Sequence, residues 1–175
     1  MAMIQPTTEL DRNFSTDGAT ACPWADALAI LETAETFWLS SVRPDGRPHV
    51  ATLLAVWLEG AMHIRTGVTE RKAKNLAGDP RVVLTTGCNT QTGLDVVVEG
   101  EAVRLTDDAM PQRLADAWVA KYGEGWRFTV RDGAFHHGAG AIQDEASKAY
   151  VFRIDPTTVI GFSKGDVFSQ THWRF

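Results

Sequence analysis

The chain has few cysteines, and their spacing excludes the usual metal and disulfide frameworks. Its 175 residues include only Cys22 and Cys88, which are far apart and form no CxxC motif. Two such thiols predict neither a zinc site nor a disulfide, and they fit a reducing compartment. The neighbours His136 and His137 would point to opposite faces of a strand and are poor joint ligands. We therefore predict no metal.

Long apolar runs and an excess of basic charge are also missing. The apolar stretches are far shorter than a membrane span, and the N-terminus lacks the basic-then-apolar order of a signal peptide. The 22 acidic residues outnumber the 17 basic ones, and the net charge of −5 argues against a nucleic-acid-binding surface. The sequence predicts a soluble cytoplasmic protein without nucleic-acid or membrane partners, in which a local basic cluster serves a small anion.

No internal repeat and no interdomain linker divides the chain. With 44% hydrophobic residues, 175 residues suffice for one domain with a substantial core and are too few for two ordinary domains. Residues 1–20 mix Thr, Asp, Asn, Gly and Ser without hydrophobic periodicity, which is typical of a flexible arm. The prediction is an N-terminal arm, residues 1–20, followed by a single domain, residues 21–175.

Hydrophobic periodicity predicts mostly strands in hairpin order, with a few short helices. The expected strands are residues 37–42, 49–58, 61–66, 81–87, 94–105, 149–154 and 158–162. The expected helices are residues 23–33 and 70–77, and a third that is capped by residues 106–108 and runs to residue 120. Residues 122–148, rich in Gly, His and Asp, receive no assignment.

Residues 49–58 are apolar on both faces of the predicted strand. Alternate residues from Val50 to Leu58 point one way and those from Ala51 to Trp57 point the other, and both sets are mainly apolar. Both faces of such a strand have to be buried. This is typical of a closed barrel whose outer face is covered by a helix, a cofactor or a second subunit. The predicted fold class is α+β, a small barrel of six or more mostly antiparallel strands with a few short helices.

Arg71 and Lys72 are the most informative residues, because they open a predicted helix directly after a strand. The hydroxyls of Thr66 and Thr69, the free N–H groups of the first turn and the positive end of the helix dipole would converge on one anion. Arginine grips phosphate with a bidentate fork, and lysine adds a point charge. Taken alone, the cluster would also describe the solvated face of a surface helix, so the phosphate assignment depends on the rest of the chain.

The order of these motifs resembles the pyridoxamine 5′-phosphate oxidase-like family, also called the flavin/deazaflavin oxidoreductase or FMN-binding split-barrel family. The marks are VRPDGRPH at residues 42–49, RKAKNL at 71–76, DPR at 79–81, VVVEG at 96–100 and the closing QTHWRF at 170–175. The resemblance implies a split β-barrel homodimer that binds FMN or the deazaflavin coenzyme F-420 in grooves at the subunit interface.

The resemblance also implies a cofactor-binding set drawn from two subunits. Its members are Arg71, Lys72, Thr66 and Arg65 at the phosphate, Ala51, Thr52, Leu53 and Leu54 under the ring, Asp95 where many relatives place a glutamine, and Trp173 and Arg174 from the partner subunit. Val56 stands where the true pyridoxamine phosphate oxidases carry a lysine, and their C-terminal Arg-x-His signature is missing. Pyridoxamine phosphate is therefore not the expected substrate.

The implied function is hydride transfer between the bound cofactor and a small unsaturated or quinone-like molecule. Flavin and deazaflavin rings perform this chemistry themselves, so no catalytic side chain is assigned. The negatively charged tail of F-420 would use Lys74, Arg65 and Arg174, which favours the deazaflavin slightly over FMN.

The alternative is a non-catalytic split barrel that binds or senses flavin or haem. A haem would need an axial ligand, for which the sequence offers His49, His63 and His172 without selecting among them. His63 is expected to be partly exposed on its strand.

Overall fold

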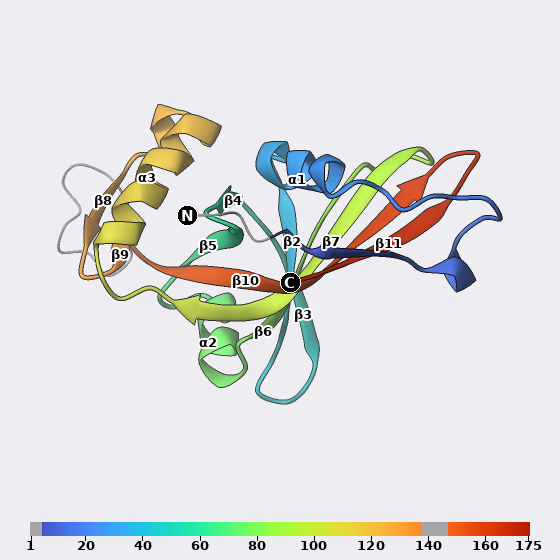
Figure 1. Cartoon of the computed structure of the whole chain (residues 1–175). Coiled ribbons are helices and arrows are strands. Elements are labelled where there is room, and N and C mark those ends of the chain that lie inside the picture. Colours follow the sequence, from blue (N-terminus) through green and yellow to red (C-terminus); the bar gives the residue numbers. More distant parts are fainter. Residues whose placement is uncertain (1–4, 138–146) are drawn as a thin grey trace.

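Strand β10, Lys148–Lys164, organises the sheet, because four other strands pair with it. The computed structural model describes residues 5–137 and 147–175. One edge of β10 carries β5 (Ala61–Gly67) and β11 (Ser169–Arg174), and the other carries β9 (Ala134–His137) and β7 (Gly93–Arg104). All four pairings are antiparallel, so β10 joins the two halves of a sheet that curls into an open barrel (Figure 1).

The remaining strands extend the sheet in the order β1-β11-β10-β7-β6-β2-β3, with β4 on β5 and β8 on β9. Their bounds are β1 Thr7–Leu10, β2 Phe37–Val42, β3 Pro48–Leu53, β4 Ala55–Leu58, β6 Arg81–Thr86 and β8 Phe128–Arg131. The helices are α1 Trp24–Thr33, α2 Arg71–Gly78 and α3 Ala109–Tyr122, with 3-10 turns η1 Arg12–Phe14 and η2 Glu124–Trp126. No helix in the described ranges is long and apolar enough to cross a membrane. The predicted α+β class, built round a small antiparallel barrel, is confirmed.

The interior of the barrel forms the main core. Phe37 and Leu39 of β2 are fully buried there, because alternate residues of a strand point to the same side. Helix α1 adds Ala27 and Leu31, which lie on one face at i, i+4 spacing. Burying each large apolar side chain stabilises the fold by roughly 1.5–3 kcal/mol, which holds α1 against the barrel.

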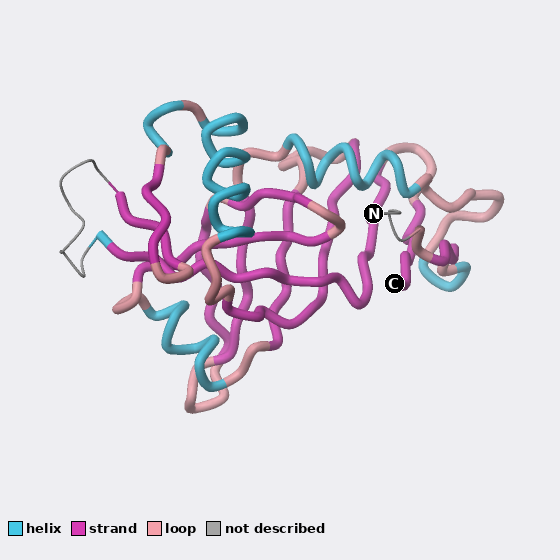
Figure 2. Tube along the Cα trace, turned by 60° about the vertical axis from the view of Figure 1, so that its left-hand side comes forward, coloured by secondary structure: helices cyan, strands magenta, loops and turns pink. Residues whose placement is uncertain are grey.

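A second core lies under α3. Its buried members include Leu114 and Trp118 of α3 and Phe135 of β9, and Phe128 of β8 stacks on Phe135 with ring centroids 4.6 Å apart. Figures 1 and 2 show α1 and α3 on one side of the sheet and α2 on the other. The start of α2 therefore lies at the side of the barrel away from α1 and α3.

The strand predicted over residues 49–58 is two strands, β3 and β4. The prediction was wrong at Leu54, where β3 ends its pairing with β2 and β4 begins its pairing with β5. The apolar alternation runs through this point without interruption, so hydrophobic pattern alone does not reveal a change of partner. The break lets the chain cross from one half of the barrel to the other.

The two strands predicted over residues 149–154 and 158–162 are one strand, β10. Asp155 and Pro156 look like a turn in the sequence, but they lie inside β10 at a register shift between Pro156 and Thr158. A bulge is one of the few places where a strand tolerates proline, because no ladder hydrogen bond needs its missing N–H.

Four strands were not predicted: β1 within the expected arm, β8 and β9 within residues 122–148, and β11 in the tail. Strand β1 has no buried residue, so it carries no hydrophobic period. In β11 the inward side chains include Ser169 and Thr171, so burial alternates but hydropathy does not. The parts of residues 122–148 that the structure describes also form a strand pair, β8 with β9.

Candidate anion and cofactor site

Helix α2 begins directly after β5 and is fixed to the barrel by one buried hydrogen bond. Asn75, only 1% exposed, donates from Nδ2 to Ser41 Oγ of β2 at 3.0 Å. Ala73 and Leu76 on the same side are also buried, whereas Arg71 and Lys74 are exposed. The helix therefore presents its first turn beside the end of β5, where Thr66 is buried.

Four basic residues from three segments gather at this end of the barrel. The pKa of His49 on β3 is lowered by burial first and then by Arg43, Lys72 and Arg71, so all three cations lie close enough to act on it. Arg43 belongs to the β2–β3 hairpin, and the cofactor-binding set predicted from the sequence did not include it. We call Arg43, His49, Thr66, Arg71 and Lys72 the anion seat.

Two polar atoms of the anion seat are buried without a hydrogen-bond partner. They are Arg43 Nε and His49 Nδ1. Buried polar groups in proteins are almost always paired, so such orphans need an explanation. A protonated guanidinium nitrogen can only donate, so the chemistry of the site fits an anionic oxygen ligand.

The strand that was predicted to lie under the ring is at an edge of the sheet. Within the described residues β3 pairs with β2 only, which leaves its other edge open. Thr52 faces outward beside Trp38, while Ala51 and Leu53 are half-buried on the inner side, and Leu54 lies at the break. The open edge ends beside the anion seat, because His49 belongs to the same strand.

The break after β3 is held by the last turn of α3. The Tyr122 hydroxyl donates to Ala55 O at 2.7 Å and accepts from Ala55 N at 3.2 Å, and Lys121 Nζ donates to Ala55 O at 3.0 Å. Burial raises the pKa of Tyr122 to about 12 and lowers that of Lys121 to about 8. Sequence reasoning missed both residues, because their role depends on where a distant strand is interrupted.

Arg65 lies against two neighbouring aromatic rings. Its guanidinium is 5.1 Å from the ring centroids of both Trp126 and Phe128. Burial lowers the pKa of Arg65, and Glu70 counteracts this effect. Arg65 is therefore near the start of α2, but its guanidinium already makes cation–π contacts with these two rings.

Asp95, Trp173 and Arg174 do not join the anion seat within one chain. Asp95 accepts from Cys88 N at 2.9 Å and pairs with Lys164 Nζ at 2.7 Å, which holds the loop after β6. Arg174 pairs with Glu9 at 3.7 Å.

Trp173 is enclosed in the core of its own chain. It has no exposed surface, its ring lies 5.6 Å from that of Trp24, and a Cβ on Gly161 would come within 2.5 Å of it. Trp173 is opposite Val159 on β10 and Thr66 is opposite Tyr150, which separates them by roughly 30 Å along an extended strand. Trp173 is buried within its own chain, and its approach to the cofactor of a partner subunit stays a prediction.

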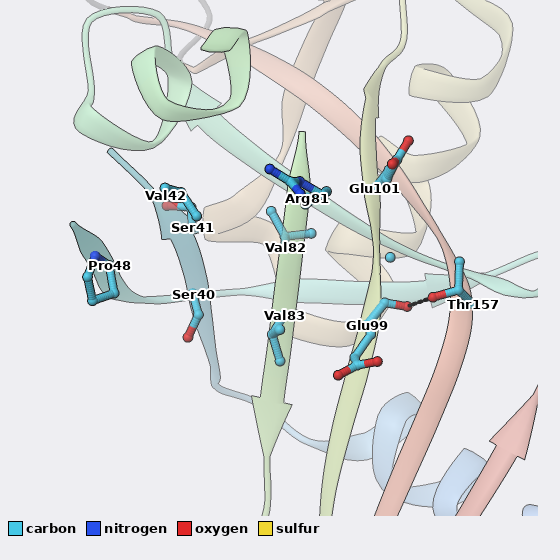
Figure 3. Close-up of a pocket in the computed structure, with 11 residues that line it drawn as sticks. Ser40, Ser41, Val42, Pro48, Arg81, Val82, Val83, Glu99, Glu101 and Thr157 are labelled. Atoms are coloured by element: carbon cyan, nitrogen blue, oxygen red, sulfur yellow. Dashed lines mark hydrogen bonds between the residues drawn. The ribbon is translucent and has the colours of Figure 1, made fainter. Parts of the chain in front are cut away.

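A groove of about 590 Å³ crosses the outer face of the sheet (Figure 3). Its lining comes from β2, β3, β6, β7 and β10 and includes Ser40, Val42, Pro48, Val83 and Glu101. It is mainly apolar and lies on the opposite side of β2 from the barrel core. Sequence reasoning missed this groove, because it forms only where five strands come together.

The histidines considered as haem ligands lie in different environments. His63 is fully buried, which corrects the expectation of partial exposure. His172 lies 3.0 Å from Gln170 Nε2 at the β11 end of the molecule. Among the described residues, no group of three His, Cys, Asp or Glu side chains is arranged to hold a metal ion.

A comparison with family models gives one match for this chain. The family model described as pyridoxamine 5′-phosphate oxidase matches residues 24–161, most of the chain. The match includes the hairpin, α2 and β7 motifs on which the resemblance rested, and it confirms that resemblance. No curated protein sequence matches the chain.

Solved structures share the fold at low sequence identity. The conserved hypothetical protein Rv2991 from Mycobacterium tuberculosis has a TM-score of 0.60 at 20% identity, covering 81% of this chain and 85% of that one. An F420 reductase has a TM-score of 0.52 at 19% identity, covering 75% and 93%. HutZ, the haem storage protein from Vibrio cholerae, has a TM-score of 0.59 at 17% identity, covering 81% and 94%. At these identities the likeness concerns the fold alone.

Proposed function

This chain belongs to the pyridoxamine 5′-phosphate oxidase family, and from that premise we propose that it is a flavin- or deazaflavin-dependent oxidoreductase. It holds the phosphate of FMN or F-420 in the anion seat and transfers a hydride between the cofactor and a small unsaturated or quinone-like molecule. The two cysteines are free thiols, in keeping with a cytoplasmic setting.

The proposal rests on one observation. Several cations lie close together at the anion seat, and two buried nitrogen atoms there have no hydrogen-bond partner. Arg71 and Lys72 act on His49 together with Arg43, and Arg43 Nε and His49 Nδ1 have no partner. Cations that lie close together repel one another unless an anion compensates them, and of these cations Glu70 pairs with Lys72 alone. A phosphate ester supplies that charge and several acceptor oxygens at once.

The chain orients the cofactor and excludes water from it. The bound ring supplies the hydride chemistry. The open edge of β3 offers backbone N–H and C=O groups to a polar ring edge, and Leu53 and Leu54 offer an apolar wall. Anchoring a remote phosphate fixes the position of a reacting ring, which is how binding energy contributes to rate.

We propose further that the active unit is a homodimer. The outer face of β2 and β3 exposes Trp38 and Val50, which are 43% and 58% exposed and lie on the same side of paired strands. This face also carries the apolar groove of Figure 3. A second copy would cover that surface and complete the cofactor groove at the edge of β3.

The test begins with the chromophore. Purified protein is examined for bound FMN, F-420 or haem by absorption spectrum and mass, and its reduced form is mixed with quinones to measure reoxidation. Bound flavin or deazaflavin with faster reoxidation supports the oxidoreductase. A bound flavin or haem without turnover would favour the storage or sensing alternative, for which the fold of HutZ is a precedent.

The phosphate assignment is tested by the double variant Arg71→Ala/Lys72→Ala. One charged hydrogen bond is worth roughly 1.5–3 kcal/mol, so losing both cations weakens FMN binding on the order of a hundredfold or more. Titration of FMN into each protein, followed by flavin fluorescence, measures the change. The matched control is Arg12→Ala/Arg127→Ala, which removes two exposed arginines elsewhere. Equal affinity in all three proteins would contradict the assignment.

A further inference from the structure

The carboxylate of Glu70 is held by donors that the proposed function assigns to the phosphate. Its Oε1 accepts from Gly67 N at 3.1 Å, and its Oε2 accepts from the Thr66 hydroxyl at 3.4 Å. The same Oε2 forms an ion pair with the ammonium of Lys72. Two residues of the anion seat therefore already bind a negative charge that belongs to the chain.

These bonds do not cap the helix. Glu70 is the N-cap residue of α2, yet its side chain accepts no capping hydrogen bond from a backbone N–H of the first turn. Its bonds run back to the end of β5 and across to Lys72. The Glu70 side chain is 44% exposed, whereas that of Lys72 is 16% exposed. Rotation about the side-chain torsions of Glu70 can therefore move the carboxylate into solvent without moving the helix.

The carboxylate is charged at neutral pH. Burial acts to raise the pKa of Glu70, but the hydrogen bonds from Lys72, Gly67 and Thr66 outweigh it, so the pKa lies below its ordinary value. A phosphate monoester carries a charge of about −1.5 to −2 under the same conditions. Two anions that need the same donors repel each other and exclude each other from the site.

Resting on the proposed function, we propose that Glu70 is a resident anion that has to leave the seat when the cofactor phosphate enters, and that it thereby sets the affinity for phosphate-bearing ligands. The anion seat binds the phosphate only in the state in which the Glu70 carboxylate has left it. If that state is populated at about 1–10%, the apparent affinity falls ten- to hundredfold below that of a permanently empty seat. Glu70 makes the site selective, because a ligand without phosphate gains nothing by displacing it.

The experiment compares FMN with riboflavin, which has the same ring but no phosphate. Both are titrated into the full-length wild type, Glu70→Gln and Glu70→Ala, and flavin fluorescence reports binding. The matched control is Glu32→Gln, because Glu32 is an exposed glutamate on α1, on the other side of the barrel from α2 (Figure 1). Each of these variants removes one negative charge, so a general effect of net charge appears equally in the control.

We expect FMN to bind Glu70→Gln and Glu70→Ala at least about tenfold more tightly than wild type, with riboflavin and the Glu32→Gln control unchanged. Unchanged or weaker FMN binding in both Glu70 variants, alongside the expected loss in Arg71→Ala/Lys72→Ala, overturns this inference and leaves the proposed function standing. If FMN binds none of the proteins, or binds them all regardless of Arg71 and Lys72, the proposed phosphate site fails and this inference fails with it. Circular dichroism identifies any variant that does not fold, and the other Glu70 variant then decides.

Discussion

The buried imidazole of His63 ties the stability of this fold to pH. His63 has no exposed surface, and neither ring nitrogen has a hydrogen-bond partner of acceptable geometry, although backbone groups of Val56 and Ala61 lie nearby. Burial, and after it the neighbouring Arg153, lowers the pKa of His63 from 6.5 to about 4. The folded protein therefore keeps this ring neutral in mildly acidic solution, where an unfolded chain protonates it.

The expected result is a loss of stability on acidification. The contribution of His63 is complete above its unfolded pKa of 6.5 and declines as the pH falls towards the folded value of about 4. The difference corresponds to about 3 kcal/mol in the free energy of unfolding. Urea unfolding of wild type and His63→Leu between pH 7 and pH 4 measures it, and the variant should show a shallower decline.

An exposed histidine supplies the control for this measurement. His137→Gln changes a residue on the surface of β9 and should retain the pH dependence of the wild type. If His63→Leu loses stability with acid as steeply as the wild type, other groups dominate the acid response and the role given to His63 is wrong.

At the scale of elements, the last turn of α3 maintains the discontinuity between β3 and β4. At this point the Ala55 backbone changes from one strand pairing to another, and Tyr122 satisfies both its N–H and its C=O. A buried backbone group without a hydrogen-bond partner lowers the free energy of unfolding. The Tyr122 hydroxyl therefore stabilises the fold beyond what the packing of its ring contributes.

Tyr122→Phe should therefore destabilise the protein by about 1–3 kcal/mol, because it leaves backbone groups of Ala55 without this partner. Thermal and urea unfolding measure the change. Tyr150→Phe is the matched control, because Arg104 contacts the face of that ring, 3.6 Å from its centroid, and the contact survives removal of the hydroxyl. Equal stability of the two variants would contradict the structural role given to the Tyr122 hydroxyl.

At the scale of the whole molecule, the outer face of β2 and β3 carries exposed apolar side chains, which we expect a second copy of the chain to bury. Trp38 and Val50 are exposed there, and the groove of Figure 3 continues the apolar surface across β6 and β7. Exposed apolar patches of this kind usually mark interaction sites. The same face adjoins the open edge of β3, so dimerisation and cofactor binding are expected to depend on each other.

The prediction is that the wild type has the mass of two 19.2 kDa chains and that Trp38→Glu does not. A carboxylate buried in an apolar interface loses its hydration without a partner, which opposes association. Light scattering after size exclusion measures the mass. Phe14→Glu is the control, because Phe14 is 63% exposed on η1, away from this face. A wild-type monomer, or a Trp38→Glu dimer of undiminished affinity, would contradict the proposed interface.

Much of this architecture follows from the sequence by itself, because amphipathic period and turn chemistry are local. Helix α1 and strand β2 begin and end within one residue of the predicted positions, and Arg71 and Lys72 do open a helix after a strand. The strands that escaped prediction, such as β1 and β11, lack an apolar period of their own.

Only the tertiary structure decided which residues meet. Arg43 and His49 join Arg71 because a hairpin and a distant helix close on the same end of the barrel. The break at Leu54 exists because two neighbouring segments pair with different strands. Strand pairing joins residues that are far apart in the chain. The stability of a strand therefore depends on partners that a short stretch of sequence does not include. The sequence by itself determined the family and the elements that have an apolar period of their own, and the folded chain determined the shape and charge of the site.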